Sequence, residues 1–142
     1  MKILSVNTSD AAGIAKNPRP EGCLVEKSGL QGDAHAGSSR QVSLLARESY
    51  EKHEKTASLP CGTYAENLTT EGLILHHYPV GTVVKAGEAL LEITQIGKNC
   101  HNACEIRKLS GKCVMPLEGV FARVLVSGFV RPGDPVRIVE NK

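Results

Sequence analysis

Three cysteines and one histidine lie within a single short stretch of the chain, GKNCHNACEIRKLSGKC, at residues 97–113. Thiolates and imidazoles are the usual ligands of structural zinc, and four of them complete a tetrahedral site. The stretch supplies that number with Cys100, His101, Cys104 and Cys113. The paired Cys-x-x-Cys knuckles of common zinc sites are absent, so zinc binding is one of two open interpretations.

The other interpretation needs only one reactive thiol. Cys100 has Lys98 and His101 as close neighbours in the sequence, and nearby cations favour the thiolate, which is the nucleophilic and metal-binding form of cysteine. Cys104 follows four residues later, so on a helix both sulfurs would share one face. A disulfide between them is less favoured than free thiols in a reducing compartment. On this interpretation the chemistry belongs to Cys100, with Cys104 as a resolving or protecting thiol and Cys113 as mainly structural, and the zinc interpretation stays open.

A glycine-rich segment, GLQGDAHAGSSRQVSLL at residues 29–45, is a second candidate for chemistry. Glycines let backbone N–H groups approach a ligand closely, and Arg40 can bind a phosphate through two parallel hydrogen bonds. Asp33 and His35 add polar groups to the same segment. An ordinary polar loop with turn glycines explains the pattern equally well. The spacings of a Walker loop and of a dinucleotide fingerprint are absent.

The third candidate is AENLTTEGL, at residues 65–73. Its side chains, above all Asn67, could donate hydrogen bonds to a polar ligand. Asparagine and threonine also satisfy local backbone groups in turns, and this is their commoner use. Both interpretations of Asn67 stay open from the residues alone.

These candidates must be positioned by a scaffold of short strands. Strand patterns occur at residues 2–7, 23–27, 41–46, 82–85, 89–95, 121–126 and 136–140. Gly87 in KAGE suits the positive φ of a hairpin turn. Residues 47–57, RESYEKHEKTA, lack Gly and Pro and predict a short, largely solvated helix, and residues 100–108 could form another. The pattern predicts a mainly β fold, an antiparallel or mixed β-barrel with one or two short helices.

The length of 142 residues suits a single domain, and we expect residues 1–142 to form one. With 17 basic and 15 acidic residues, the net charge of +2 is too balanced to predict a nucleic-acid partner. The first residues, MKILSVNTSD, lack the apolar run of a signal peptide. No apolar run is long enough to span a membrane. We expect a cytoplasmic protein with neither a membrane nor a nucleic acid as partner.

Taken in order, GLQGDAHAG, RQVSLL, AENLTTEGL, PVGT, GEALLEITQ and SGFVRPGDPV resemble the MOSC domain, the module named for the C-terminal part of molybdenum-cofactor sulfurases. The resemblance extends from about residue 29 to residue 136. It implies a MOSC-type β-barrel with a pocket and a reactive cysteine after the TQ segment. That cysteine corresponds to Cys100. The segments that line the family's pocket contain Asp33, His35, Arg40 and Asn67.

The resemblance implies a molybdenum-cofactor-related sulfur carrier or cofactor-binding protein. In larger members the module binds the molybdenum cofactor (molybdopterin), whose pterin carries a phosphate. Their cysteine, here Cys100, holds sulfur as a persulfide or acts as a molybdenum ligand. The pyridoxal-phosphate domain of full-length sulfurases does not fit in this chain, so pyridoxal phosphate is not expected. A sulfurtransferase-type activity would depend on an external donor such as a cysteine desulfurase, and proteins of molybdenum-cofactor biosynthesis are the other expected partners.

The alternative is a non-catalytic zinc-binding or interaction module built on Cys100, His101, Cys104 and Cys113. The hydroxylamine-reducing activity of some larger relatives ranks behind both interpretations, because nothing in the sequence indicates an electron-transfer partner.

Overall fold

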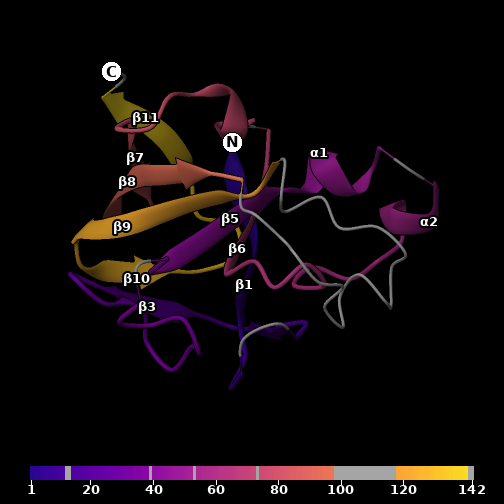
Figure 1. The fold of residues 1–142 in the computed structure, drawn as a ribbon, viewed down its shortest axis with the longest axis horizontal. Helices are drawn as coiled ribbons and strands as arrows, with labels where there is room; N and C mark the ends of the chain where they lie inside the picture. Colours follow the sequence, from indigo (N-terminus) through magenta and orange to yellow (C-terminus); the bar gives the residue numbers. More distant parts are fainter. Residues whose placement is uncertain (12–13, 39, 53, 73, 98–117, 141–142) are drawn as a thin grey trace.

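The computed structural model describes residues 1–11, 14–38, 40–52, 54–72, 74–97 and 118–140. Strands dominate these residues, as Figure 1 shows. The strands are β1 (Lys2–Thr8), β2 (Asn17–Arg19), β3 (Gly22–Val25), β4 (Gly29–Leu30), β5 (Val42–Ala46), β6 (Leu68–Glu71), β7 (Val83–Ala86), β8 (Ala89–Ile96), β9 (Val120–Val126), β10 (Gly128–Val130) and β11 (Val136–Glu140). The helices are α1 (Arg47–Tyr50), α2 (Glu54–Ala57) and the 3-10 helix η1 (Leu75–His77). The prediction of a mainly β fold with few short helices is confirmed.

Eight strands form one mixed sheet in the order β11-β7-β8-β9-β5-β6-β1-β2, and β10, β3 and β4 form a smaller sheet. Strands β5 and β6 run parallel, with Leu44 opposite Leu68, and the other neighbouring strands pair antiparallel. The large sheet is not closed into a complete barrel. An isolated bridge between Lys2 and Pro135 nevertheless joins the start of β1 to the turn before β11.

The two faces of the large sheet differ in chemistry because side chains alternate along each strand. On β5, Val42 and Leu44 belong to the main hydrophobic core, while Ser43 and Leu45 point to the opposite face. Strands β1 and β6 follow the same rule, with Ser5, Asn7 and Thr69 as buried polar side chains outside the main core. A smaller apolar cluster covers this second face with Leu45, Tyr50, Tyr64, Ala65 and Phe121. The second face is therefore a buried polar layer, and it carries the candidate site.

Local sequence signals predicted some elements better than others. The β7–β8 hairpin is confirmed, with Gly87 at φ 56° in its turn. No strand was predicted within residues 65–73, but residues 68–71 form β6, a central strand. The prediction of a single, largely solvated helix at residues 47–57 was wrong, because two short helices form there and Tyr50 is fully buried. Among the described residues, no helix is long and apolar enough to cross a membrane.

Candidate functional site

A fully buried ion pair lies at the centre of the candidate site. The Lys16 Nζ atom is 2.7 Å from Asp33 Oδ1, and both side chains are 0% exposed. Lys16 also donates to Ser9 Oγ at 3.0 Å, and the Ser9 backbone N–H donates to Asp33 Oδ1 at 3.0 Å. Buried charges need such partners, since removal from water is costly. The two loops that contain Lys16 and Asp33 are thus joined through their charged side chains.

The pKa of Asp33 reflects this environment. Burial alone would raise the pKa of the carboxyl, but hydrogen bonds from Lys16, Asn67 and the backbone N–H of His35 outweigh burial and hold the pKa well below its usual range. Asp33 is therefore a carboxylate at any physiological pH. Its negative charge balances the positive charge of Lys16, so the pair adds no net charge to the site.

His35 connects this buried pair to the surface. Its backbone N–H donates to Asp33 Oδ2 at 3.1 Å, and its ring Nδ1 lies 3.3 Å from Lys16 Nζ. The same Nδ1 is 3.5 Å from Asp33 Oδ2. The His35 side chain is 29% exposed, which leaves part of its ring open to a ligand. The predicted residues Asp33 and His35 are thus in direct contact.

A glycine allows the loop of residues 60–66 to pack closely against Lys16. Gly62 has φ +92°, a backbone conformation that favours glycine. A Cβ atom there would lie 2.4 Å from the Lys16 carbonyl oxygen. The Gly62 carbonyl accepts the Lys16 backbone N–H at 2.8 Å. The position of Lys16 therefore depends on the absence of a side chain at residue 62.

Asn67 joins three strands of the second face. Its Oδ1 accepts the Ser43 backbone N–H at 2.9 Å, and its Nδ2 donates to the Asn7 carbonyl at 3.2 Å. The residue is fully buried. These bonds reach backbone groups that are distant in sequence, so they are not those of a local turn, and the amide also contributes to the low pKa of Asp33. Asn67 thus stands next to the ion pair, within the same polar layer.

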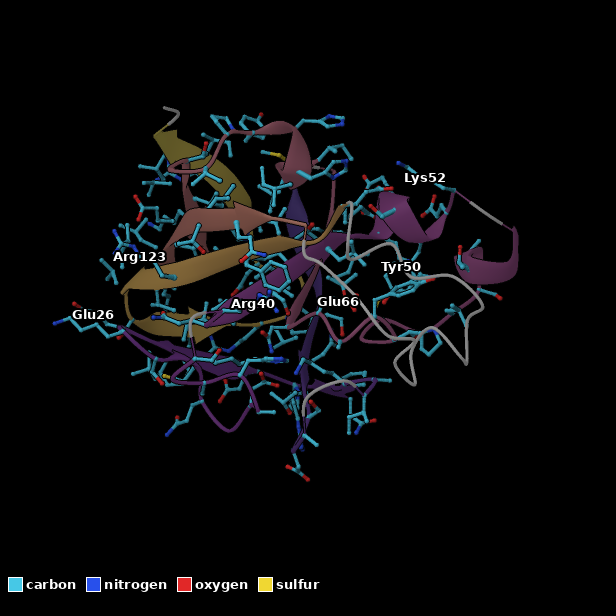
Figure 2. The ribbon with its side chains drawn as sticks, in the orientation of Figure 1. Glu26, Arg40, Tyr50, Lys52, Glu66 and Arg123 are labelled. Carbon is cyan, nitrogen blue, oxygen red and sulfur yellow. The ribbon has the colours of Figure 1, made fainter. Side chains whose placement is uncertain are left out.

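Arg40 lies to one side of this group, two residues before β5, and its guanidinium lies over Phe121 of β9. Its guanidinium carbon is 5.4 Å from the centroid of the Phe121 ring, and Phe121 pairs with Ser43 across β5 and β9. Figure 2 shows Arg40 over the strands of the large sheet. Within the described part of the chain, no carboxylate lies within ion-pair distance of Arg40. Its charge is therefore available to an anion.

A second buried polar group lies further along the same layer, where Tyr50, the last residue of α1, contacts Glu66 (Figure 2). The Tyr50 hydroxyl donates to Glu66 Oε2 at 2.6 Å, and Thr69 Oγ1 donates to the same oxygen at 2.8 Å. Glu66 Oε1 is buried and has no hydrogen-bond partner among the described residues. Burial raises the pKa of Glu66 despite these two hydrogen bonds, and burial, followed by the charge of Glu66, raises that of Tyr50.

The residues on either side of the cysteine stretch are well anchored. The Gly97 N–H donates to the Gly119 carbonyl at 2.7 Å, where β8 ends and β9 is about to begin. Glu118 accepts hydrogen bonds from Ser49 at 2.7 Å and from Lys52 at 2.8 Å, which connects it to α1 and the residues after it. Cys100 itself lies outside the described residues, as do His101, Cys104, Cys113 and the helix expected at residues 100–108. Among the residues that the structure describes, no group of three or more His, Cys, Asp and Glu side chains could hold a metal ion.

Two parts of this site were missed by the sequence analysis. Lys16 lies 17 residues before Asp33, within AAGIAKNPRP, and no spacing rule connects the two. Tyr50 and Glu66 were missed because α1 was expected to be solvated. The aromatic Tyr64 two residues before Glu66 was the available signal of a buried segment.

Comparisons with known proteins agree with this architecture. The family model described as MOSC domain matches residues 31–137. The uncharacterized protein YflK of Bacillus subtilis is 28% identical over 144 residues, which cover 91% of this chain and 64% of YflK. The chain therefore spans less than two thirds of the length of that relative.

Crystal structures with the same fold include YiiM from Geobacillus stearothermophilus and the YuaD protein from Bacillus subtilis. YiiM has a TM-score of 0.73 at 23% identity, with 98% of this chain and 75% of YiiM covered. YuaD has a TM-score of 0.77 at 14% identity, with 95% of this chain and 93% of YuaD covered. At these identities the likeness concerns the fold. Because the family model spans well over half of the chain, the protein belongs to the MOSC domain family.

Proposed function

We propose that this chain binds the molybdenum cofactor, or a related pterin that carries a phosphate, and that Cys100 carries a sulfur atom or ligates molybdenum beside it. Membership of the MOSC family associates the chain broadly with the molybdenum cofactor. The proposal is carried by two donors of the same segment: Arg40, which has no acidic partner among the described residues, and His35, which is partly exposed beside the buried ion pair.

The chemistry of the described side chains fits a phosphate group. Arg40 stacks on Phe121 and has donors arranged for two parallel hydrogen bonds to phosphate oxygens. His35 offers a ring nitrogen, and its position is supported by Lys16 and Asp33. Lys16 would not bind the phosphate directly, since its side chain is fully buried and paired. When bound, the cofactor would supply a molybdenum centre, and a thiolate such as that of Cys100 is a suitable soft ligand.

The sulfur-carrier role assigns one exchange reaction to Cys100. Its thiolate would attack the outer sulfur of a persulfide on a donor protein, such as a cysteine desulfurase. The donor's S–S bond breaks, a new S–S bond forms on Cys100, and the donor leaves as a thiolate. No external oxidant or reductant is needed. Proteins of molybdenum-cofactor biosynthesis are the proposed acceptors.

Mass spectrometry of the intact protein tests the sulfur role. Wild type, Cys100→Ser and Cys61→Ser are incubated with a cysteine desulfurase and cysteine. Cys61 is the matched control because it is a half-buried free thiol outside the cysteine stretch. We expect the added mass of one sulfur atom on wild type and Cys61→Ser, but not on Cys100→Ser. Equal loading of Cys100→Ser, or bound zinc that depends on the cysteines, would contradict the assignment.

A binding titration with inorganic phosphate tests the anion role. Arg40→Gln removes a charge that has no acidic partner within the described residues, whereas Arg137→Gln removes one from an exposed position on β11. Loss of a charge-assisted hydrogen bond weakens binding by about tenfold or more. We expect that loss for Arg40→Gln and an unchanged affinity for Arg137→Gln. Equal affinities of the two variants would exclude Arg40 from the binding site.

A further inference from the structure

The buried Lys16–Asp33 pair requires an explanation beyond its own stability. Buried ion pairs contribute little net stability, because removing both charges from water offsets their attraction. The two charges also cancel, so the pair cannot attract an anion by net charge. What distinguishes it is its contact with His35, whose side chain is partly exposed while those of Lys16 and Asp33 are completely buried.

The hydrogen bonds of Lys16 determine what His35 can do. A lysine ammonium has three donors and no acceptor. One donor faces Asp33 Oδ1 at 2.7 Å, one faces Ser9 Oγ at 3.0 Å, and His35 Nδ1 lies 3.3 Å from the same nitrogen. His35 Nδ1 can only accept in this contact. A neutral imidazole that accepts at Nδ1 has its proton on Nε2.

The competing contact is weaker. His35 Nδ1 would need to carry the proton in order to donate to Asp33 Oδ2, which lies 3.5 Å away and therefore beyond the usual range of N–H···O hydrogen bonds. Asp33 Oδ2 already accepts the His35 backbone N–H at 3.1 Å. The two alternatives predict opposite tautomers of the same ring.

We propose that Lys16 is a positioning residue that holds His35 as an Nε2–H donor, so that this position recognises an anionic oxygen, such as one of a phosphate, and not a metal ion. The inference rests on the proposed function and adds the chemical class of ligand that His35 binds. An imidazole that already uses Nδ1 as an acceptor and carries a proton on Nε2 has no free lone pair for a metal. Arg40 and His35 would then supply two kinds of donor, one charged and one neutral.

Nitrogen NMR of the His35 ring in the full chain tests the tautomer directly. We expect Nε2 to be protonated and Nδ1 to be unprotonated in wild type at neutral pH. A protonated Nδ1 would overturn the proposal without any variant. Lys16→Met should convert His35 to a mixture of tautomers, because it removes the donor to Nδ1. Lys2→Met is the matched control, since Lys2 is half exposed at the start of β1, where it is 3.9 Å from Glu71 Oε1.

A second variant is needed, since Lys16→Met leaves Asp33 buried without its partner and could fail to fold. Lys16→Met/Asp33→Ala removes both charges and leaves neither side chain able to donate to Nδ1. We expect this double variant to show mixed His35 tautomers and to bind inorganic phosphate about tenfold more weakly than wild type, the effect of one lost donor to a charged group. Unchanged tautomer and affinity would overturn the role of Lys16. Absence of phosphate binding to wild type, with Nε2 protonated, would instead contradict the proposed function.

Discussion

Two buried carboxyl groups of the same polar layer have opposite electrostatic environments. Asp33 accepts hydrogen bonds from Lys16, Ser9 and the His35 backbone, and its pKa is lowered. Glu66 accepts hydrogen bonds from the neutral hydroxyls of Tyr50 and Thr69, and its pKa is raised by burial. The difference follows from the presence or absence of a cation beside each group. It leads to opposite pH dependences of stability.

The ionised carboxylate of Asp33 should stabilise the folded state at neutral pH and lose this contribution in acid. Its pKa is lowered from the usual 3.8, so the ionised form is favoured by folding and its contribution is lost as the pH falls below that value. Asp33→Asn removes this dependence. At neutral pH it also leaves Lys16 buried and unpaired, which costs about 3–5 kcal/mol. Urea unfolding between about pH 2 and pH 6 measures both effects.

Asp10→Asn is the control for this prediction, because Asp10 is exposed. An unchanged acid dependence in Asp33→Asn would mean that the buried ion pair does not contribute to acid sensitivity.

The effect of Glu66 on the unfolding free energy should have the opposite pH dependence. Burial raises its pKa above the usual 4.5, so folding favours the protonated form. The unfolding free energy of wild type therefore falls as the pH rises from 4.5 through the raised pKa. Glu66→Gln abolishes this fall, and its stability relative to wild type should improve from acidic to neutral pH. Urea unfolding of Glu66→Gln beside the exposed Glu71→Gln checks the prediction, and parallel pH curves for the two variants would contradict it.

The residues of the site were predictable only in part. Asp33 and His35 could be grouped because both lie in one short polar segment, and the structure brings them into contact. Lys16 could not be added to them, because its contact with Asp33 depends on how two separate loops pack. Whether Asp33, His35, Arg40 and Asn67 bind a cofactor stays a prediction, as does the role of Cys100.

At the scale of elements, the loop before β6 determines where Lys16 is placed. Gly62→Ala would add a Cβ atom 2.4 Å from the Lys16 carbonyl oxygen, at φ +92°. We expect this variant to lose stability and to displace Lys16, since both the backbone conformation and the contact are unfavourable. Gly37→Ala is the matched control, because Gly37 has φ +83° and nothing within 4 Å of its Cβ position.

Gly37→Ala should lose only the unfolding free energy that a side chain costs in this left-handed backbone conformation, about 1–2 kcal/mol. A larger loss of unfolding free energy in Gly62→Ala, together with an altered His35 resonance, would support the close packing. Equal losses in the two variants, with His35 unchanged, would contradict it.

The elements differ in how far local sequence determines them. The β7–β8 hairpin depends on neighbours and on Gly87, so its pattern was sufficient. β6 pairs with β5 and β1, which are distant in sequence, and its threonines suggested a turn. Residues 47–57 contain good helix formers, but Tyr50 packs against Leu45 and Tyr64 in the smaller cluster, and tertiary packing overrides local propensity.

At the scale of the whole molecule, hydrogen bonds join the first strand, β1, to the turn that leads into the last strand, β11. The Ile3 N–H donates to the Asp134 carbonyl at 2.9 Å, and the Gly133 N–H donates to the Ile3 carbonyl at 2.7 Å. Ile3 is also fully buried in the main core. The two ends of the chain thus share one set of contacts, although the strand ladder is not completely closed.

These contacts predict cooperative opening of both ends. Ile3→Ala removes a fully buried side chain and should cost about 2–5 kcal/mol of unfolding free energy, whereas Val139→Ala, at a half-exposed position on β11, should cost about 0.5 kcal/mol or less. Hydrogen exchange of the Ile3 and Gly133 amides should accelerate by the same factor in Ile3→Ala, because both require the same opening. The turn amide of Ser28, bonded to the Val25 carbonyl, should exchange through local opening and stay unchanged. Fast exchange of Gly133 that is independent of Ile3→Ala would mean that the C-terminal strand opens separately from the core.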